Sequence, residues 1–417
     1  MNKFYSRASY DFLFKIMILW LGVDVVLSVI RLAASFLSLN QDMFGFFSNL
    51  VTMFFFFAAI LIYLLERKVM YIDLTIVCIL LFLIILAGFT GLYNYGVTDA
   101  SVKHLYMVFF AIGFILFGRG LSFFLANLER FYSIIIVVFF LNVLAVILFL
   151  VFSSVMPIYP GYGTQALGYV FFYFLSTNRV FLAFISFLLL VSQGKRSIMI
   201  AAILTFLISK LISRRCVGIS LVSSIFVGVA VLFLFLYIIE YFNLYSLPGL
   251  DRMLYINPLN GSFDLALGSS GRFDEVVGAL ASFSENILNW FIGAGFGFHY
   301  QWQLTYGDFY SEVKSYMHNV PLMVIALFGV PIFMTFYSFI IYIFIRIRKL
   351  LARVSDPDLY QLVNFFSLSL LFFVLCSFFS LNSLSDPLGW VFLGACLGVI
   401  QKQKIQNLNN NQSQILK

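Results

Sequence analysis

Residues 131–153 read FYSIIIVVFFLNVLAVILFLVFS, without one charged side chain. A helix crosses a hydrocarbon core of about 30 Å with about 20 mainly apolar residues, so this stretch predicts a membrane span. Similar stretches recur along the chain in both directions. We expect about twelve spans, near residues 12–38, 43–65, 70–90, 103–118, 131–153, 157–177, 179–193, 197–212, 218–241, 317–345, 361–380 and 386–400. The sequence therefore predicts an all-α polytopic membrane protein.

The overall composition points the same way. Of the 417 residues, 62% are hydrophobic and 10% are charged, whereas soluble proteins carry about 25% charged residues. The net charge of +7 comes from short Lys and Arg clusters between the spans. Membrane topology explains such clusters, so they do not indicate nucleic-acid binding. The four cysteines are scattered singly, and no disulfide framework or zinc site is expected.

The basic clusters predict the orientation of the spans. When the spans are threaded alternately, one side receives Lys3, Arg7, Lys15, Arg67, Lys68, Arg119, Arg130, Arg179, Arg214, Arg215, residues 346–353, Lys402 and Lys404. Positively charged loops face the cytoplasm, so both termini are predicted to be cytoplasmic. Residues 242–316 then form one large outer-face loop. It separates an N-terminal bundle (1–241) of about nine spans from a C-terminal part (317–417) of about three spans and a short cytoplasmic tail.

One basic pair departs from this pattern. Lys195 and Arg196, within the sequence Ser-Gln-Gly-Lys-Arg-Ser at 192–197, fall on the outer face. Either the span count in the short segments of 157–193 is off by one, or the two cations lie outside because they bind an anion.

The outer loop concentrates the polar chemistry of the chain. Residues 242–316 carry ten charged side chains between long hydrophobic segments. Within it, residues 272–291 place apolar side chains at helical spacing, with Asp274 and Glu275 in the first turn, where the helix dipole favours anions. We expect an amphipathic helix in the membrane interface. The next turn, residues 293–297, reads Gly-Ala-Gly-Phe-Gly. Its glycines either let backbone amides approach a ligand closely or are needed for purely steric reasons.

A candidate site combines Arg272 before this helix, Gly295 and Gly297 after it, and His318-Asn319 at the start of the next span. Arginine presents a planar fork of donors that matches phosphate oxygens. Histidine has the unperturbed pKa nearest neutrality, which suits proton transfer. Structural alternatives stay open, because Arg272 could pair with an acidic residue of the first turn and His318 could bond to backbone at the membrane interface.

Together these features resemble the bacterial O-antigen polymerase and O-antigen ligase superfamily of membrane glycosyltransferases. The likeness covers residues 155–335 and is carried by 194–197 (Gly-Lys-Arg-Ser), 270–272 (Ser-Gly-Arg), 293–297 and the pair His318-Asn319 followed by Gly329. Residues 195–197 read Lys-Arg-Ser where the family has Ser-Arg-Gly, and Ile332 stands where a small or hydroxyl residue is expected. These departures favour a polymerase over a ligase.

The resemblance implies a GT-C-like helical bundle in the bacterial plasma (inner) membrane, with the active site facing the periplasm or exterior. The donor would be a growing glycan on undecaprenyl diphosphate, and the acceptor a repeat unit on the same lipid, or lipid A–core for a ligase. No metal and no cofactor would be needed. Membrane lipids, a chain-length regulator and a flippase would be its partners, and nucleic acid would not.

The same resemblance implies roles for the candidate residues. Arg196 and Arg272, with Lys195, would stabilise the leaving diphosphate, at about 2.7–4 kcal/mol for each such donor in a dry cavity. His318 would either take the proton of the acceptor hydroxyl or bind the diphosphate. Asp274 and Glu275 are the alternative bases. In-line attack would invert the anomeric carbon.

Four further residues are expected to contact substrate. Gly295, Gly297 and Asn319 lie next to the proposed reaction centre in sequence. Tyr300 could stack on a sugar face, or it could anchor the loop in the membrane interface.

A polysaccharide flippase is the main alternative from another class, because such transporters also have about twelve spans. Transporters usually show two similar halves and short loops. This chain has one large loop in its second half and no visible repeat, which favours an enzyme.

Overall fold

The computed structural model describes residues 2–36, 42–65, 71–125, 127–155, 165–192, 196–212, 237, 240–241, 272–303, 311–315, 317–379 and 387–415. Its long helices are α1 (Asn2–Phe36), α2 (Asp42–Leu65), α3 (Tyr71–Tyr95), α4 (Asp99–Phe124), α5 (Tyr132–Val155), α14 (Val330–Leu351), α15 (Pro357–Phe379) and α16 (Pro387–Ile415). Its shorter helices are η1 (Glu129–Phe131), α6 (Gln165–Ser176), α7 (Val180–Ser192), α8 (Arg196–Ile212), α11 (Arg272–Ser284), α12 (Asn289–Ile292) and α13 (Val320–Phe328).

This architecture confirms an all-α polytopic membrane protein. Seven of the described helices are long and apolar enough to cross a membrane: those of α1 to α5, α14 and α15. Three shorter apolar segments lie in α6, α7 and α8. The expected span at 218–241 lies outside the described residues, apart from 237, 240 and 241. The total of about twelve spans therefore stays a prediction.

The single span predicted at 317–345 is wrong. The chain is broken at Gly329, whose φ is +83°, into α13 and α14. Pro331 follows at once, and a proline inside a continuous helix would remove a backbone hydrogen bond and clash with the preceding turn. A Cβ on Gly329 would lie 2.4 Å from the carbonyl oxygen of Phe291. The break at Gly329 therefore packs against α12. Helix α13 has 9 residues and is too short to span a membrane.

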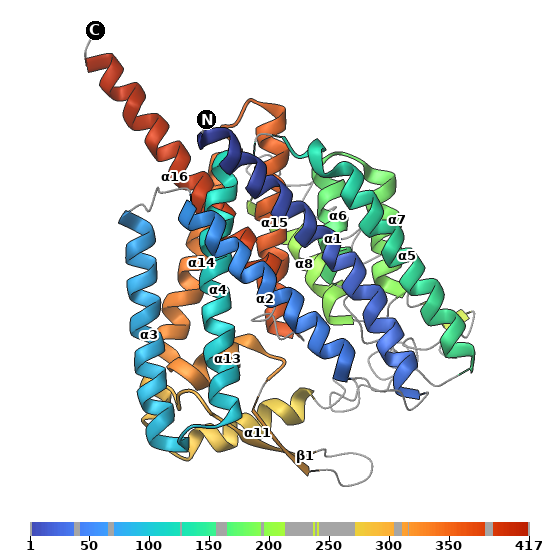
Figure 1. Ribbon diagram of the computed structural model, residues 1–417, viewed down its shortest axis with the longest axis vertical. Coiled ribbons are helices and arrows are strands. Elements are labelled where there is room, and N and C mark those ends of the chain that lie inside the picture. The colour runs from blue at the N-terminus through green and yellow to red at the C-terminus, as the bar shows by residue number, and fades with distance from the viewer. Residues whose placement is uncertain are drawn as a thin grey trace.

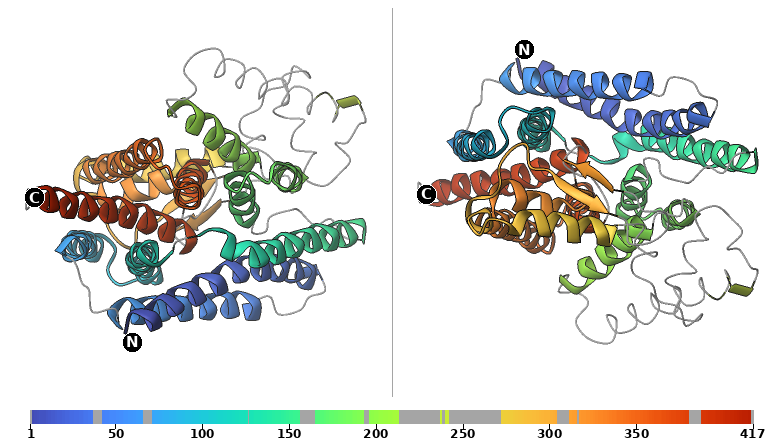
Figure 2. Two further views of the ribbon diagram at one scale, coloured as in Figure 1. Left: turned by 90° about the horizontal axis from the view of Figure 1, so that it is seen from above. Right: turned by 90° about the horizontal axis from the view of Figure 1, so that it is seen from below.

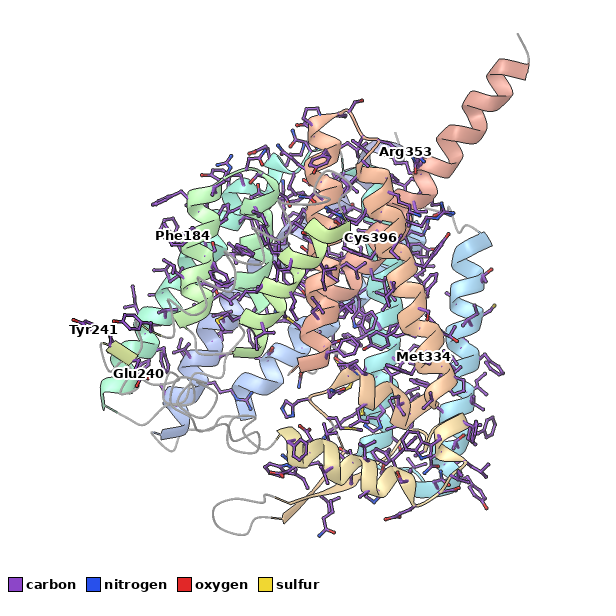
Figure 3. The ribbon with its side chains drawn as sticks, turned by 180° about the vertical axis from the view of Figure 1, so that it is seen from behind. Phe184, Glu240, Tyr241, Met334, Arg353 and Cys396 are labelled. Carbon is purple, nitrogen blue, oxygen red and sulfur yellow. The ribbon has the colours of Figure 1, made fainter. Side chains whose placement is uncertain are left out.

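Contacts between helix ends define one end of the bundle, here called the basic end. Arg179, after α6, pairs with Glu129 of η1 at 2.8 Å. Arg348, near the end of α14, donates to the carbonyl oxygen of Ser209, near the end of α8, at 3.2 Å. Arg353 lies there as well (Figure 3), and α1 begins and α16 ends on this side (Figure 1). These basic residues and both terminal helix ends therefore share one end.

The opposite end, here called the loop end, carries α11, α12 and two short strands (Figure 2, right). Strands β1 (Tyr300–Gln303) and β2 (Ser311–Lys314) pair antiparallel, with Tyr300 opposite Lys314. This hairpin was not predicted from the sequence. On α11, Phe273 and Val277 are 52% and 51% exposed, one turn apart. Such an apolar stripe is what an interfacial helix presents to lipid.

The helix predicted over 272–291 ends earlier than expected, at Ser284. The backbone N–H of Leu288 donates to the side chain of Asn286 at 3.0 Å. Such an Asx turn competes with the helical hydrogen-bond pattern. The remaining residues form the separate single-turn helix α12, which directs the chain into the glycine turn.

The centre of the bundle is a close contact between α4 and α16. A Cβ on Gly118 would lie 2.0 Å from the carbonyl oxygen of Val391, and a Cβ on Gly394 would lie 2.0 Å from that of Ile115. Small residues at such a contact let two membrane helices approach closely. Cys396 sits in this interior (Figure 3). The packing fixes α4, which in turn supports the loop end.

Candidate functional site

Glu275 and His318 form the polar centre of the loop end. They are 43 positions apart in the chain; Glu275 lies in the first turn of α11, and His318 lies just before α13. The backbone N–H of His318 donates to Glu275 Oε1 at 3.0 Å, and the imidazole Nδ1 lies 3.1 Å from both carboxylate oxygens. The Glu275 side chain is 5% exposed and that of His318 is 24% exposed. A buried carboxylate thus holds a partly exposed imidazole.

The contact with Glu275 sets the tautomer of His318. A carboxylate oxygen can only accept, so Nδ1 must carry the hydrogen in this pair. In the neutral ring the lone pair then lies on Nε2. In a protonated ring both nitrogens would donate.

Tyr300 belongs to the same cluster. Its hydroxyl donates to Glu275 Oε1 at 2.9 Å, and its ring stacks on Phe298 with the centroids 6.2 Å apart. Tyr300 is 1% exposed. Its side chain positions the Glu275 carboxylate. The predicted stacking on a sugar would need an exposed ring face, and this ring is buried.

Asn319 fixes the start of α13. Its Oδ1 accepts the backbone N–H of Leu322 at 2.9 Å, and its Nδ2 donates to the carbonyl oxygen of Phe378 in α15 at 3.0 Å. An N-cap of this kind contributes about 1 kcal/mol to helix stability. Asn319 therefore anchors the segment that carries His318. Its predicted contact with substrate stays a prediction.

The glycine turn packs against the transmembrane helices. Gly295 has φ +85°, and a Cβ there would lie 2.2 Å from the backbone nitrogen of Gly91 in α3. The N–H of Phe296 donates to the carbonyl oxygen of Ala87 at 2.9 Å. The N–H of Gly297 donates to His104 Nδ1 at 3.1 Å. The steric alternative thus accounts for Gly295 and Gly297, and their contact with substrate stays a prediction.

His104 is a residue of this region that the sequence did not single out. It lies in α4 and is 1% exposed. Because Nδ1 accepts the N–H of Gly297, the hydrogen is on Nε2, which lies 2.6 Å from the carbonyl oxygen of Ser315. His104 thereby ties both the glycine turn and the end of the hairpin to α4. The two partners are 193 and 211 positions away, so no local pattern could reveal the contact.

Of the three candidate cations, Arg272 and Arg196 lie in described helices. Arg272 is the first residue of α11, three positions before Glu275. Arg196 is the first residue of α8. Since α8 reaches the basic end at Ser209, Arg196 begins it on the side of the loop end. The outer-face position of Lys195 and Arg196 stays a prediction, and Lys195 lies outside the described residues.

Gly295→Ala is expected to destabilise the protein strongly. The substitution combines a left-handed backbone, at about 1–2 kcal/mol, with overpacking against α3, at about 1–3 kcal/mol. Gly96→Ala is the matched control, since Gly96 has φ +70° but no atom within 4 Å of a Cβ. Thermal unfolding in detergent should show a clearly larger drop in Tm for Gly295→Ala. Equal drops would mean that the packing on Gly91 contributes nothing.

Comparison with protein-family models, with curated proteins and with solved structures finds no match. Function must therefore be argued from the site. The described part of that site consists of a buried carboxylate and a partly exposed imidazole that contacts it.

Proposed function

We propose that the protein is a membrane glycosyltransferase that polymerises surface-polysaccharide repeat units, of the O-antigen or capsule type. It would transfer a growing glycan from undecaprenyl diphosphate to a repeat unit on the same lipid. The supporting observation is the Glu275–His318 pair at the loop end, with Arg272 one turn away on α11. Proton transfer and phosphate binding, the two requirements of this reaction, would then meet in one place.

The chemistry follows from these groups. A diphosphate leaving group gains negative charge as its bond to the anomeric carbon breaks. Arg272 and Arg196, with Lys195, would neutralise that charge, and such donors are most effective where water is excluded. Attack from the opposite side would invert the anomeric carbon, and neither a metal nor a cofactor would take part. The exposed apolar residues of α11, Phe273 and Val277, would keep the site at the lipid surface where the carrier lies.

The orientation of the protein in the membrane is part of this proposal. We place the basic end in the cytoplasm, following the positive-inside rule, and the loop end at the outer face of a bacterial plasma membrane. Val313 of β2 is 66% exposed, and Ser355, between α14 and α15, is exposed at the basic end. In a background without native cysteines, a membrane-impermeant maleimide should label Val313→Cys in intact spheroplasts. It should label Ser355→Cys only after lysis, and the reverse pattern would reject this orientation.

A reconstituted system tests the activity. The purified protein in nanodiscs, given undecaprenyl-diphosphate-linked repeat units, should produce a ladder of multiples of the unit on a gel. Transfer only after addition of lipid A–core would indicate a ligase instead. The same protein in liposomes, forming no bond but moving the lipid-linked unit across the bilayer, would indicate a flippase. Either of the last two results would overturn the polymerase.

A further inference from the structure

We infer that Glu275 is a positioning residue which commits His318 to act as a general base through Nε2. This inference rests on the proposed glycosyl transfer for its chemical meaning. Its structural content, the tautomer of one histidine, can be measured without any activity. Of the two roles open to His318, base or diphosphate ligand, it assigns the first to the neutral ring.

The Glu275 carboxylate is held in place from several sides. Its Oε1 accepts from the Tyr300 hydroxyl at 2.9 Å, from the His318 backbone N–H at 3.0 Å and from His318 Nδ1 at 3.1 Å. Charge-assisted hydrogen bonds of this kind are about twice as strong as neutral ones. With its side chain 5% exposed, the carboxylate is shielded from water. It is therefore a fixed acceptor that locks both the backbone and the ring of His318.

A ring locked in this way favours proton acceptance. With the hydrogen on Nδ1, the neutral imidazole has its lone pair at Nε2, and a lone pair repels the oxygens of a phosphate. The same lone pair can accept the hydrogen of a sugar hydroxyl. When the ring becomes positive, the adjacent carboxylate stabilises it, as in other carboxylate–histidine pairs.

The acceptor hydroxyl oxygen forms a bond to the anomeric carbon of the donor while its proton passes to His318 Nε2. The bond between that carbon and the diphosphate oxygen breaks, and the electron pair leaves with undecaprenyl diphosphate. The imidazolium, held by Glu275, later returns its proton to water. Arginine rather than histidine would then carry the phosphate charge.

The tautomer can be read by nitrogen-15 NMR of the histidine-labelled full-length protein in lipid. The chain has 3 histidines, so His299→Gln and His318→Gln assign every signal. Above the titration range of the rings, His318 should show a protonated Nδ1 and an unprotonated Nε2. His104, with the opposite pattern of partners, should show the reverse and serves as an internal control. A protonated Nε2 on His318 would overturn the inference whether or not the protein is a glycosyltransferase.

Two substitutions extend the test. In Glu275→Ala, His318 should move toward the tautomer with the hydrogen on Nε2, while an unchanged His104 signal would report an intact loop end. A His318 signal that kept its hydrogen on Nδ1 would show that Glu275 does not set the tautomer. Glu275→Gln retains an acceptor oxygen, so the Nδ1–H form should persist although the negative charge is gone.

Kinetics supply the second readout. Glu275→Gln should lower kcat by about 10²-fold or more, with a smaller change in KM, because the charge is needed when the ring is protonated. The double variant Glu275→Gln/His318→Gln should be no slower than His318→Gln alone, because the two residues act as one unit. Multiplying losses would contradict positioning and assign Glu275 an independent role. If none of these proteins forms glycosidic bonds, the proposed function fails while the NMR result still decides the tautomer.

Discussion

Arg272→Ala is expected to abolish polymer formation while the protein remains in the membrane at its normal level. Loss of one donor to a developing charge costs about 2.7–4 kcal/mol, or about 10²–10³ in rate. The rate of repeat-unit addition by purified protein measures the effect. Arg196→Ala should give a loss of similar size. Because Arg272 lies at the start of α11, away from the packed contacts between α4 and α16, the substitution should leave the fold intact.

Two variants sharpen this prediction. Arg272→Lys should recover little activity, since an ammonium is a point charge and cannot replace the planar fork of donors. Arg353→Ala removes an exposed arginine from the basic end and should polymerise normally. A normal product ladder from Arg272→Ala would show that this residue does not bind the diphosphate.

His318→Ala is expected to be inactive, with a loss of about 10²–10⁴-fold in kcat, the range that a positioned general base contributes. His299→Ala is the matched control. His299 lies in the same part of the molecule, is exposed, and contacts the carbonyl oxygen of Gly297 at 3.1 Å. Single-turnover rates of both variants should differ by at least about 10²-fold. Near-normal turnover by His318→Ala would demote His318 to a residue that only connects α11 to α13.

The sequence was sufficient for the long helices and for the side on which the basic residues gather. Uninterrupted apolar runs such as 131–153 form helices in lipid, because a helix satisfies every backbone group within the segment. The prediction from sequence failed where a glycine and a proline interrupt such a run. Gly329 and Pro331 break the predicted span 317–345, and hydrophobicity alone obscured that signal.

The hairpin was missed for a related reason. Residues 300–303 read Tyr-Gln-Trp-Gln and residues 311–314 read Ser-Glu-Val-Lys. The first alternates large aromatic and polar side chains, which is a strand pattern. Each strand has 4 residues, and a pattern that short carries little information. The packing of β1 against α11, which buries Tyr300, is a tertiary contact that local sequence does not reveal.

The residues of the candidate site could be named from the sequence, but the contacts between them could not. His318 and Arg272 stand out as a titratable group and a cation between apolar segments, and Glu275 was among the alternative bases. That Glu275 instead holds His318 depends on a contact across 43 positions. Likewise, the glycine turn suggested an approach to a ligand, whereas Gly295 lies against Gly91 of α3. Composition and spacing identify reactive groups, and only the fold shows which of them meet.

We propose that this membrane protein breaks a glycosyl–diphosphate bond at its loop end. Its most direct test is the release of undecaprenyl diphosphate by purified protein given lipid-linked repeat units. The proposed reaction predicts one undecaprenyl diphosphate for each new linkage, with release lost in both Arg272→Ala and His318→Ala. No release from the wild type, or release that persists in both variants, would contradict the claim.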